Sequence, residues 1–163
     1  MNAHGAFRAG ISGGQNLVET YIKDLSDADL LVRAVPGTNH IAWQLGHLIA
    51  AENAMLEAVR PGSMPKLPAG FRERHSKEKA KSDDAKDFLT KDQYLKLFKE
   101  QRSATLKVLE SMSEADFDGP VPEPLSQYLR NVGDVFSMQG THWVMHAGQW
   151  ALIRRKLGHP PLF

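Results

Sequence analysis

The chain has 163 residues, of which 42% are hydrophobic, and its 20 basic and 19 acidic residues nearly cancel. This length suits one compact domain over residues 1–163, and the balanced charge argues against a nucleic-acid partner despite a basic run at Arg154–Lys156. The absence of cysteine excludes disulfide bonds, thiolate metal ligands and a cysteine nucleophile.

The N-terminal segment, residues 1–15, lacks the basic start and the continuous apolar core of a secretory signal. No stretch of the sequence approaches the roughly 18 apolar residues that span a bilayer. We therefore expect a cytoplasmic protein that makes no membrane contact.

A first helix is predicted over residues 3–25, where the second half carries apolar residues at helical spacing. Three glycines in the first half oppose it, because each costs a helix about 1 kcal/mol relative to alanine. They lack the preceding strand and the spacing of a phosphate-binding loop. These residues, which we expect to permit close helix packing, are Gly10, Gly13 and Gly14.

Three stronger helical patterns follow, each bounded by residues that stop a helix. The first runs from residue 41 to 59 before Pro61-Gly62, and the second from residue 90 or 91 to about 111–113. The third covers about 131–157 and ends before Gly158. In this last helix the spacing predicts an inner arc of Val135, Met138, His142, Met145, His146, Gln149, Ile153 and Leu157.

The remaining segments read as connections, and no alternating strand pattern occurs. Residues 61–89 form a long crossover that allows the second and third helices to run parallel and that is placed to cover the mouth of a site. Residues 120–124 contain three prolines and form an extended linker. The sequence therefore predicts an all-α protein, a four-helix bundle with a long crossover between helices two and three.

Three histidines in two of these helices suggest a metal site. His142 and His146 are four residues apart, so they project from one face of a helix and are able to bind one ion together. His47 lies in the apolar helix 41–59, which is able to face them and to supply a third imidazole.

Three imidazoles around a divalent ion leave positions open for water or substrate, as in catalytic centres. Zinc is the default for these ligands, and nickel, iron and manganese are also compatible with imidazole. Gln44 and Gln149 each lie one helix turn from a histidine, so either amide is a candidate to orient an imidazole or to contact a ligand. Glu52 is five residues from His47, a poor spacing for the same face, and we assign it no catalytic role.

Other interpretations compete with the metal site. Histidines on an apolar helix face are frequently core residues whose nitrogens are satisfied by hydrogen bonds. His40 sits at a helix start, where capping or exposure explains it. The three tryptophans line either a pocket or, as is more common, the core or a dimer contact. His4, His75 and His159 read as surface or loop residues.

The segments Asn39–Leu48 and His142–Gln149, in this order and at this separation, resemble the DinB/YfiT-like superfamily of proposed metalloenzymes. The resemblance extends over essentially the whole chain, including the closing segment 153–158. It implies a four-helix bundle, a metal ion held by His47, His142 and His146, and a homodimer.

Members of that family with assigned activities include thiol-dependent transferases and isomerases. The resemblance therefore implies that the metal activates a low-molecular-weight thiol, or water, toward an electrophilic small-molecule substrate. No general base is evident, so the catalytic residues stay unassigned. Two alternatives remain open: a noncatalytic module of the stress response that binds a metal or a small molecule, and a purely structural bundle.

Overall fold

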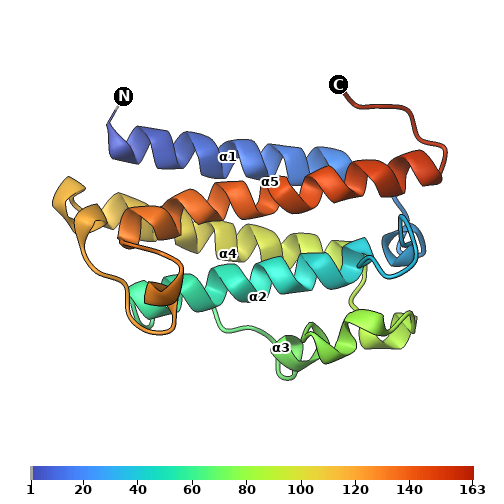
Figure 1. Ribbon diagram of the computed structural model, residues 1–163, viewed down its shortest axis with the longest axis horizontal. Coiled ribbons are helices and arrows are strands. Elements are labelled where there is room, and N and C mark those ends of the chain that lie inside the picture. Colours follow the sequence, from blue (N-terminus) through green and yellow to red (C-terminus); the bar gives the residue numbers. More distant parts are fainter. Residues whose placement is uncertain (1) are drawn as a thin grey trace.

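The computed structural model describes residues 2–163, and every regular element in that range is helical (Figure 1). The four long helices predicted from the sequence are present, which confirms the all-α expectation. They are α1 (Ala3–Ile22), α2 (Ile41–Val59), α4 (Lys91–Ser111) and α5 (Val132–Lys156). The connections hold a short helix, α3 (Phe71–Arg74), and five 3₁₀ turns, η1 (Asp29–Leu31), η2 (Glu78–Lys81), η3 (Ala85–Asp87), η4 (Glu114–Asp118) and η5 (Leu125–Gln127).

Each long helix begins at a residue whose side chain accepts a hydrogen bond from a backbone N–H of the first turn, a group that has no partner within the helix. Thr90 and Gln93 form a reciprocal capping box at the start of α4. Asn2 and Asn131 cap α1 and α5. His40 caps α2, because its Nδ1 accepts from the backbone N–H of Trp43 at 3.1 Å, so the capping interpretation of this residue is confirmed.

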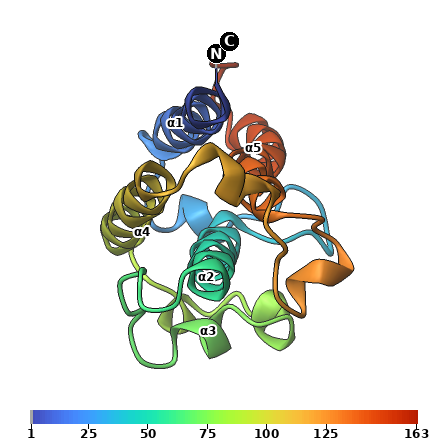
Figure 2. The same ribbon diagram turned by 90° about the vertical axis from the view of Figure 1, so that its left-hand side faces the viewer.

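The long helices run in two parallel pairs. In Figure 1, α1 and α5 run in one direction, and α2 and α4 run in the other. Figure 2, viewed along the bundle, shows the crossover between α2 and α4 lying on the outer side of α2. The crossover returns the chain to the end where α2 began, so α2 and α4 are parallel, as its length allows.

Gly10 and Gly14 of α1 serve close packing against α5, as the sequence suggested, whereas Gly13 does not, because nothing lies within 4 Å of the place of its Cβ. A Cβ placed on Gly140 would lie 2.9 Å from the backbone carbonyl atoms of Gly10, and one placed on Gly14 would lie 3.3 Å from the carbonyl oxygen of Gly140. The two backbones meet where larger residues would force them apart. This contact offsets the weak helix propensity of glycine, and α1 is one continuous helix.

The buried face of α5 differs from the predicted inner arc. Met145 is 58% exposed and Gln149 is also exposed, whereas Phe136, Trp143 and Trp150 are almost wholly buried. The reason is that α5 packs against both α1 and α2, so its buried arc is centred between these two neighbours. The prediction was therefore wrong for Met145 and Gln149.

Among residues 2–163, the length and apolar character needed to cross a membrane are not combined in any helix.

Candidate metal centre

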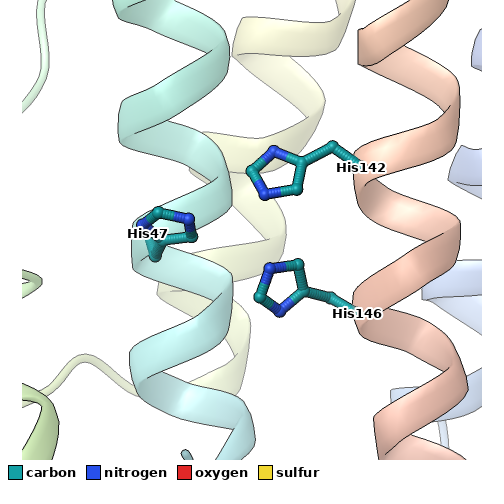
Figure 3. A group of neighbouring side chains, drawn as sticks. All are labelled: His47, His142 and His146. Carbon is teal, nitrogen blue, oxygen red and sulfur yellow. The ribbon is translucent and has the colours of Figure 1, made fainter.

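The three candidate histidines come together between α2 and α5. Figure 3 shows His47 projecting from α2 toward His142 and His146, which extend from successive turns of α5. One ring nitrogen from each residue lies within 4.8 Å of the other two. The ring centres are 5.3 Å apart for His47 and His142, 5.6 Å for His47 and His146, and 5.0 Å for His142 and His146.

This arrangement fits a metal ion in size and donor type. Imidazole nitrogens bind zinc at about 2.0–2.1 Å, so two ligands of one ion lie at most about 4.2 Å apart. The 4.8 Å spread of the triad exceeds that limit by well under 1 Å, a difference that small ring rotations close. Within the described part of the chain the group contains no carboxylate, so all ligand atoms that the protein would give to the ion are nitrogen.

The surroundings keep the three rings uncharged at neutral pH. Burial lowers the pKa of His142 and of His146 to about 4, and neighbouring imidazoles of the triad add to the effect. The pKa of His47 is lowered by burial and then by the positive charge of Lys77. A ring nitrogen binds metal only through its unprotonated lone pair, and all three rings therefore have one available.

Gln44 determines which nitrogen of His146 carries the proton. Its amide nitrogen donates to the backbone oxygen of Asn39 at 2.6 Å, and its Oε1 accepts from the indole N–H of Trp150 at 2.9 Å. An indole nitrogen only donates, so the orientation of the amide is fixed. Oε1 also lies 2.8 Å from Nδ1 of His146. This nitrogen must be the donor, which leaves Nε2 as the lone-pair atom.

Trp43 lies beside His47 and is bonded to the crossover. The ring of Trp43 lies parallel to that of His47, with 5.0 Å between centres and 6° between planes. The indole nitrogen of Trp43 donates to the backbone oxygen of Ser76 at 2.9 Å. The crossover therefore supports Trp43, and Trp43 in turn stacks on the imidazole of His47.

The site is open on one side, since His47 and His142 are only half-buried. Neither side chain makes a hydrogen bond to another group of residues 2–163, in contrast to His146. Of the two glutamines suggested by spacing, Gln44 contacts the triad. Gln149 lies on the exposed side of α5 and makes no hydrogen bond to an imidazole, because that face of the helix turns away from α2.

His75 lies in a loop of the crossover, as one of the two expectations had it, but it is not a surface residue. It is 4% exposed, its Nδ1 lies 2.7 Å from the backbone oxygen of Phe71, and its Nε2 lies 2.6 Å from the hydroxyl of Tyr94. The ring packs directly on α2 at Gly46, where a Cβ would come within 2.0 Å of it. A glycine inside an apolar helix was the signal in the sequence that another group approaches closely. His4 and His159 are partly exposed, as expected.

A second feature that spacing did not identify is a buried ion pair between α2 and α4. Glu52 and Arg102 are each 1% exposed, and Nη2 of Arg102 lies 3.1 Å from Oε2 of Glu52. Thr105 and Trp143 also donate to the Glu52 carboxylate. These contacts occupy both of its oxygens.

Comparison with known proteins supports the fold and a family. The family model described as the DinB superfamily matches residues 11–150. A crystal structure of a conserved protein from Enterococcus faecalis is similar, with a TM-score of 0.72 and 13% sequence identity, and the alignment covers 97% of this chain and 99% of that one. At this identity the likeness concerns the fold alone. No curated protein matches the chain.

Proposed function

Because the chain belongs to the DinB superfamily, we propose that His47, His142 and His146 bind one divalent metal ion and that the protein is a metal-dependent enzyme acting on a small molecule. A low-molecular-weight thiol is the proposed cosubstrate. The observation that carries the proposal is the convergence of three neutral imidazoles at a half-exposed point between α2 and α5.

A comparison with His75 argues against a purely structural role for the triad. His75 has the environment of a core histidine, since both of its nitrogens have hydrogen-bond partners and the ring is buried. His47 and His142 have neither property. Two half-exposed rings without protein partners beside a third ring whose proton is held by Gln44 form an arrangement that is typical of metal ligands.

When bound, a divalent ion supplies Lewis acidity and lowers the pKa of a thiol or water that joins it. The residues of the chain contribute in other ways. Gln44 holds the proton on Nδ1 of His146, and Trp43 keeps the ring of His47 in place. Because the ligands are neutral and no carboxylate belongs to the group, the charge of the ion would not be compensated by its protein ligands. This favours an anionic partner such as a thiolate.

Zinc is the default ion, and nickel, iron and manganese are also compatible with an all-imidazole site. The proposed reaction is a transfer or related step in which the activated thiol or water attacks an electrophilic carbon of the substrate. A homodimer and a cytoplasmic location remain predictions from the sequence.

Cobalt(II) offers a direct test, because its visible absorption reports the geometry and the ligands of the ion. The wild-type protein, freed of metal and titrated with cobalt(II), should develop the spectrum of a nitrogen-ligated ion, and His142→Ala should not. Addition of a thiol should then produce a sulfur-to-metal charge-transfer band. Cobalt(II) binding without that band would contradict the thiol-dependent reaction and favour a noncatalytic binding module. Failure of cobalt(II) to bind would refute the metal site.

A further inference from the structure

Two hydrogen bonds from indole N–H groups of α5 reach acceptors on α2, one on each side of His47. Gln44 accepts from the indole N–H of Trp150 at 2.9 Å, and Glu52 accepts from the indole N–H of Trp143 at 3.0 Å. Their acceptors are eight residues apart, about 12 Å along a helix that rises about 1.5 Å per residue. Two helices joined at two such points cannot slide or tilt without breaking one bond.

Two residues of α4 also hold the carboxylate of Glu52 in place. Thr105 donates to Oε1 of Glu52 at 2.6 Å, and Arg102 lies 3.1 Å from Oε2. Arg102 also donates from Nη1 to the backbone oxygen of Gln139 on α5 at 2.8 Å, and its guanidinium carbon lies 5.3 Å from the ring centre of Trp143. Arg102 therefore ties three helices together around one carboxylate.

Stability alone does not account for this ion pair. Removing two charges from water is costly, and apolar replacements of a buried pair are often neutral or stabilising. The best attested role of buried polar groups is to specify register, because any other alignment leaves a charge without a partner. Glu52 and Arg102, each 1% exposed, have the burial that such a role requires.

We propose that Glu52, Arg102 and Trp143, named here the register lock, are positioning residues for the metal site. They hold α2 against α5 so that His47 stays level with His142 and His146 (Figure 3). A slip of one residue would displace a ligand by about 1.5 Å and turn it by about 100°. A metal site tolerates only about 0.2 Å in its ligand distances.

The inference rests on the proposed metal site, and the double variant Glu52→Met/Arg102→Met tests it with cobalt(II) as the probe. If the register lock positions the ligands, the cobalt(II) dissociation constant of the double variant should be about tenfold or more above that of the wild type, and the visible spectrum of the bound ion should change. The urea midpoint is measured beside it, because the variant removes two buried charges but also leaves the indole N–H of Trp143 without its acceptor, two effects of opposite sign on stability. A merely structural pair would change stability and leave the spectrum as it is.

Leu109→Ala is the matched control. Leu109 is fully buried in α4 and belongs to a part of the core that contains none of the lock residues. The control should lose stability yet bind cobalt(II) with the affinity and spectrum of the wild type. If Leu109→Ala weakens cobalt(II) binding as much as the double variant does, the inference is overturned, since any loss of core packing would then be enough to disturb the metal site.

Trp143→Phe is a second variant, which keeps the ion pair and removes only the indole N–H and part of the ring. It should also weaken cobalt(II) binding, by about threefold or more, and it serves the test if the double variant does not fold. If the folded double variant or Trp143→Phe binds cobalt(II) with the affinity and spectrum of the wild type, the register lock is overturned and the proposed metal site still stands. Absence of cobalt(II) binding by the wild type itself would instead refute the proposed function.

Discussion

Replacing Gly46 by alanine should destabilise the protein, although the same change in the middle of a helix ordinarily stabilises by about 1 kcal/mol. The new Cβ would lie 2.0–2.2 Å from three ring atoms of His75. That ring is buried and engaged at both nitrogens, so it has no free direction in which to move. The change must displace His75 or push the crossover away from α2.

The magnitude follows from the groups involved. Overpacking costs about 1–3 kcal/mol, and the two hydrogen bonds of His75 contribute about 1 kcal/mol each. Subtracting the gain of about 1 kcal/mol in helix propensity leaves a net loss of about 2–4 kcal/mol. In a protein of this size that corresponds to a melting temperature lower by roughly 4–16 °C.

The assay is urea unfolding followed by circular dichroism, with chelator present so that metal binding does not contribute. Gly13→Ala is the matched control, because Gly13 lies inside α1 and nothing would lie within 4 Å of its Cβ. The control should gain about 0.5–1 kcal/mol. If Gly46→Ala unfolds at the same or a higher urea concentration than the wild type, the close packing of His75 on α2 is refuted.

Three further predictions address the site and its supports. Burial lowers the pKa of His75 to about 4, so this residue stabilises the fold fully above pH 6.5 and loses about 3 kcal/mol of stabilisation as the pH falls through 4. Metal-free His75→Gln should therefore lose less unfolding free energy than the wild type between pH 7 and 4, and an equal loss would contradict the assignment. Gln44→Leu should weaken metal binding about 10–100-fold in competition titrations, because His146 loses the acceptor for its Nδ1–H; unchanged affinity would show that this bond does not orient the ligand. Thr90→Ala should cost about 1 kcal/mol in urea unfolding through loss of the α4 cap, and a change below about 0.3 kcal/mol would contradict the capping box.

The sequence predicted the elements whose signals are local. The long helices follow from apolar periodicity and from prolines and glycines at their ends, and the histidine pair of α5 is visible as a four-residue spacing. These features depend on residues that are neighbours within one helix, so a single sequence contains them. Gln44 was named for its spacing of one turn from His47, but the imidazole that it contacts is that of His146 on α5, a contact that spacing within one helix does not predict.

The features that were missed depend on contacts between distant segments. His75 lies in a crossover without periodicity, and its burial results from Gly46 and Tyr94. Arg102 looks like a solvated charge in an amphipathic helix until Glu52, fifty positions earlier, is placed against it. The sequence did hold a hint, because Glu52 occupies an apolar stripe position of its helix. The exposure of Met145 could not be predicted, because which face of α5 is buried depends on where α1 lies.

The central claim is that His47, His142 and His146 hold one metal ion. It is tested most directly by elemental mass spectrometry of the untagged protein purified without chelator, beside His47→Ala, His142→Ala and the control His159→Ala. Close to one ion per chain is expected in the wild type and the control, and none in the other two variants. No bound metal in the wild type, and none taken up on titration with zinc, nickel, iron or manganese, would contradict it.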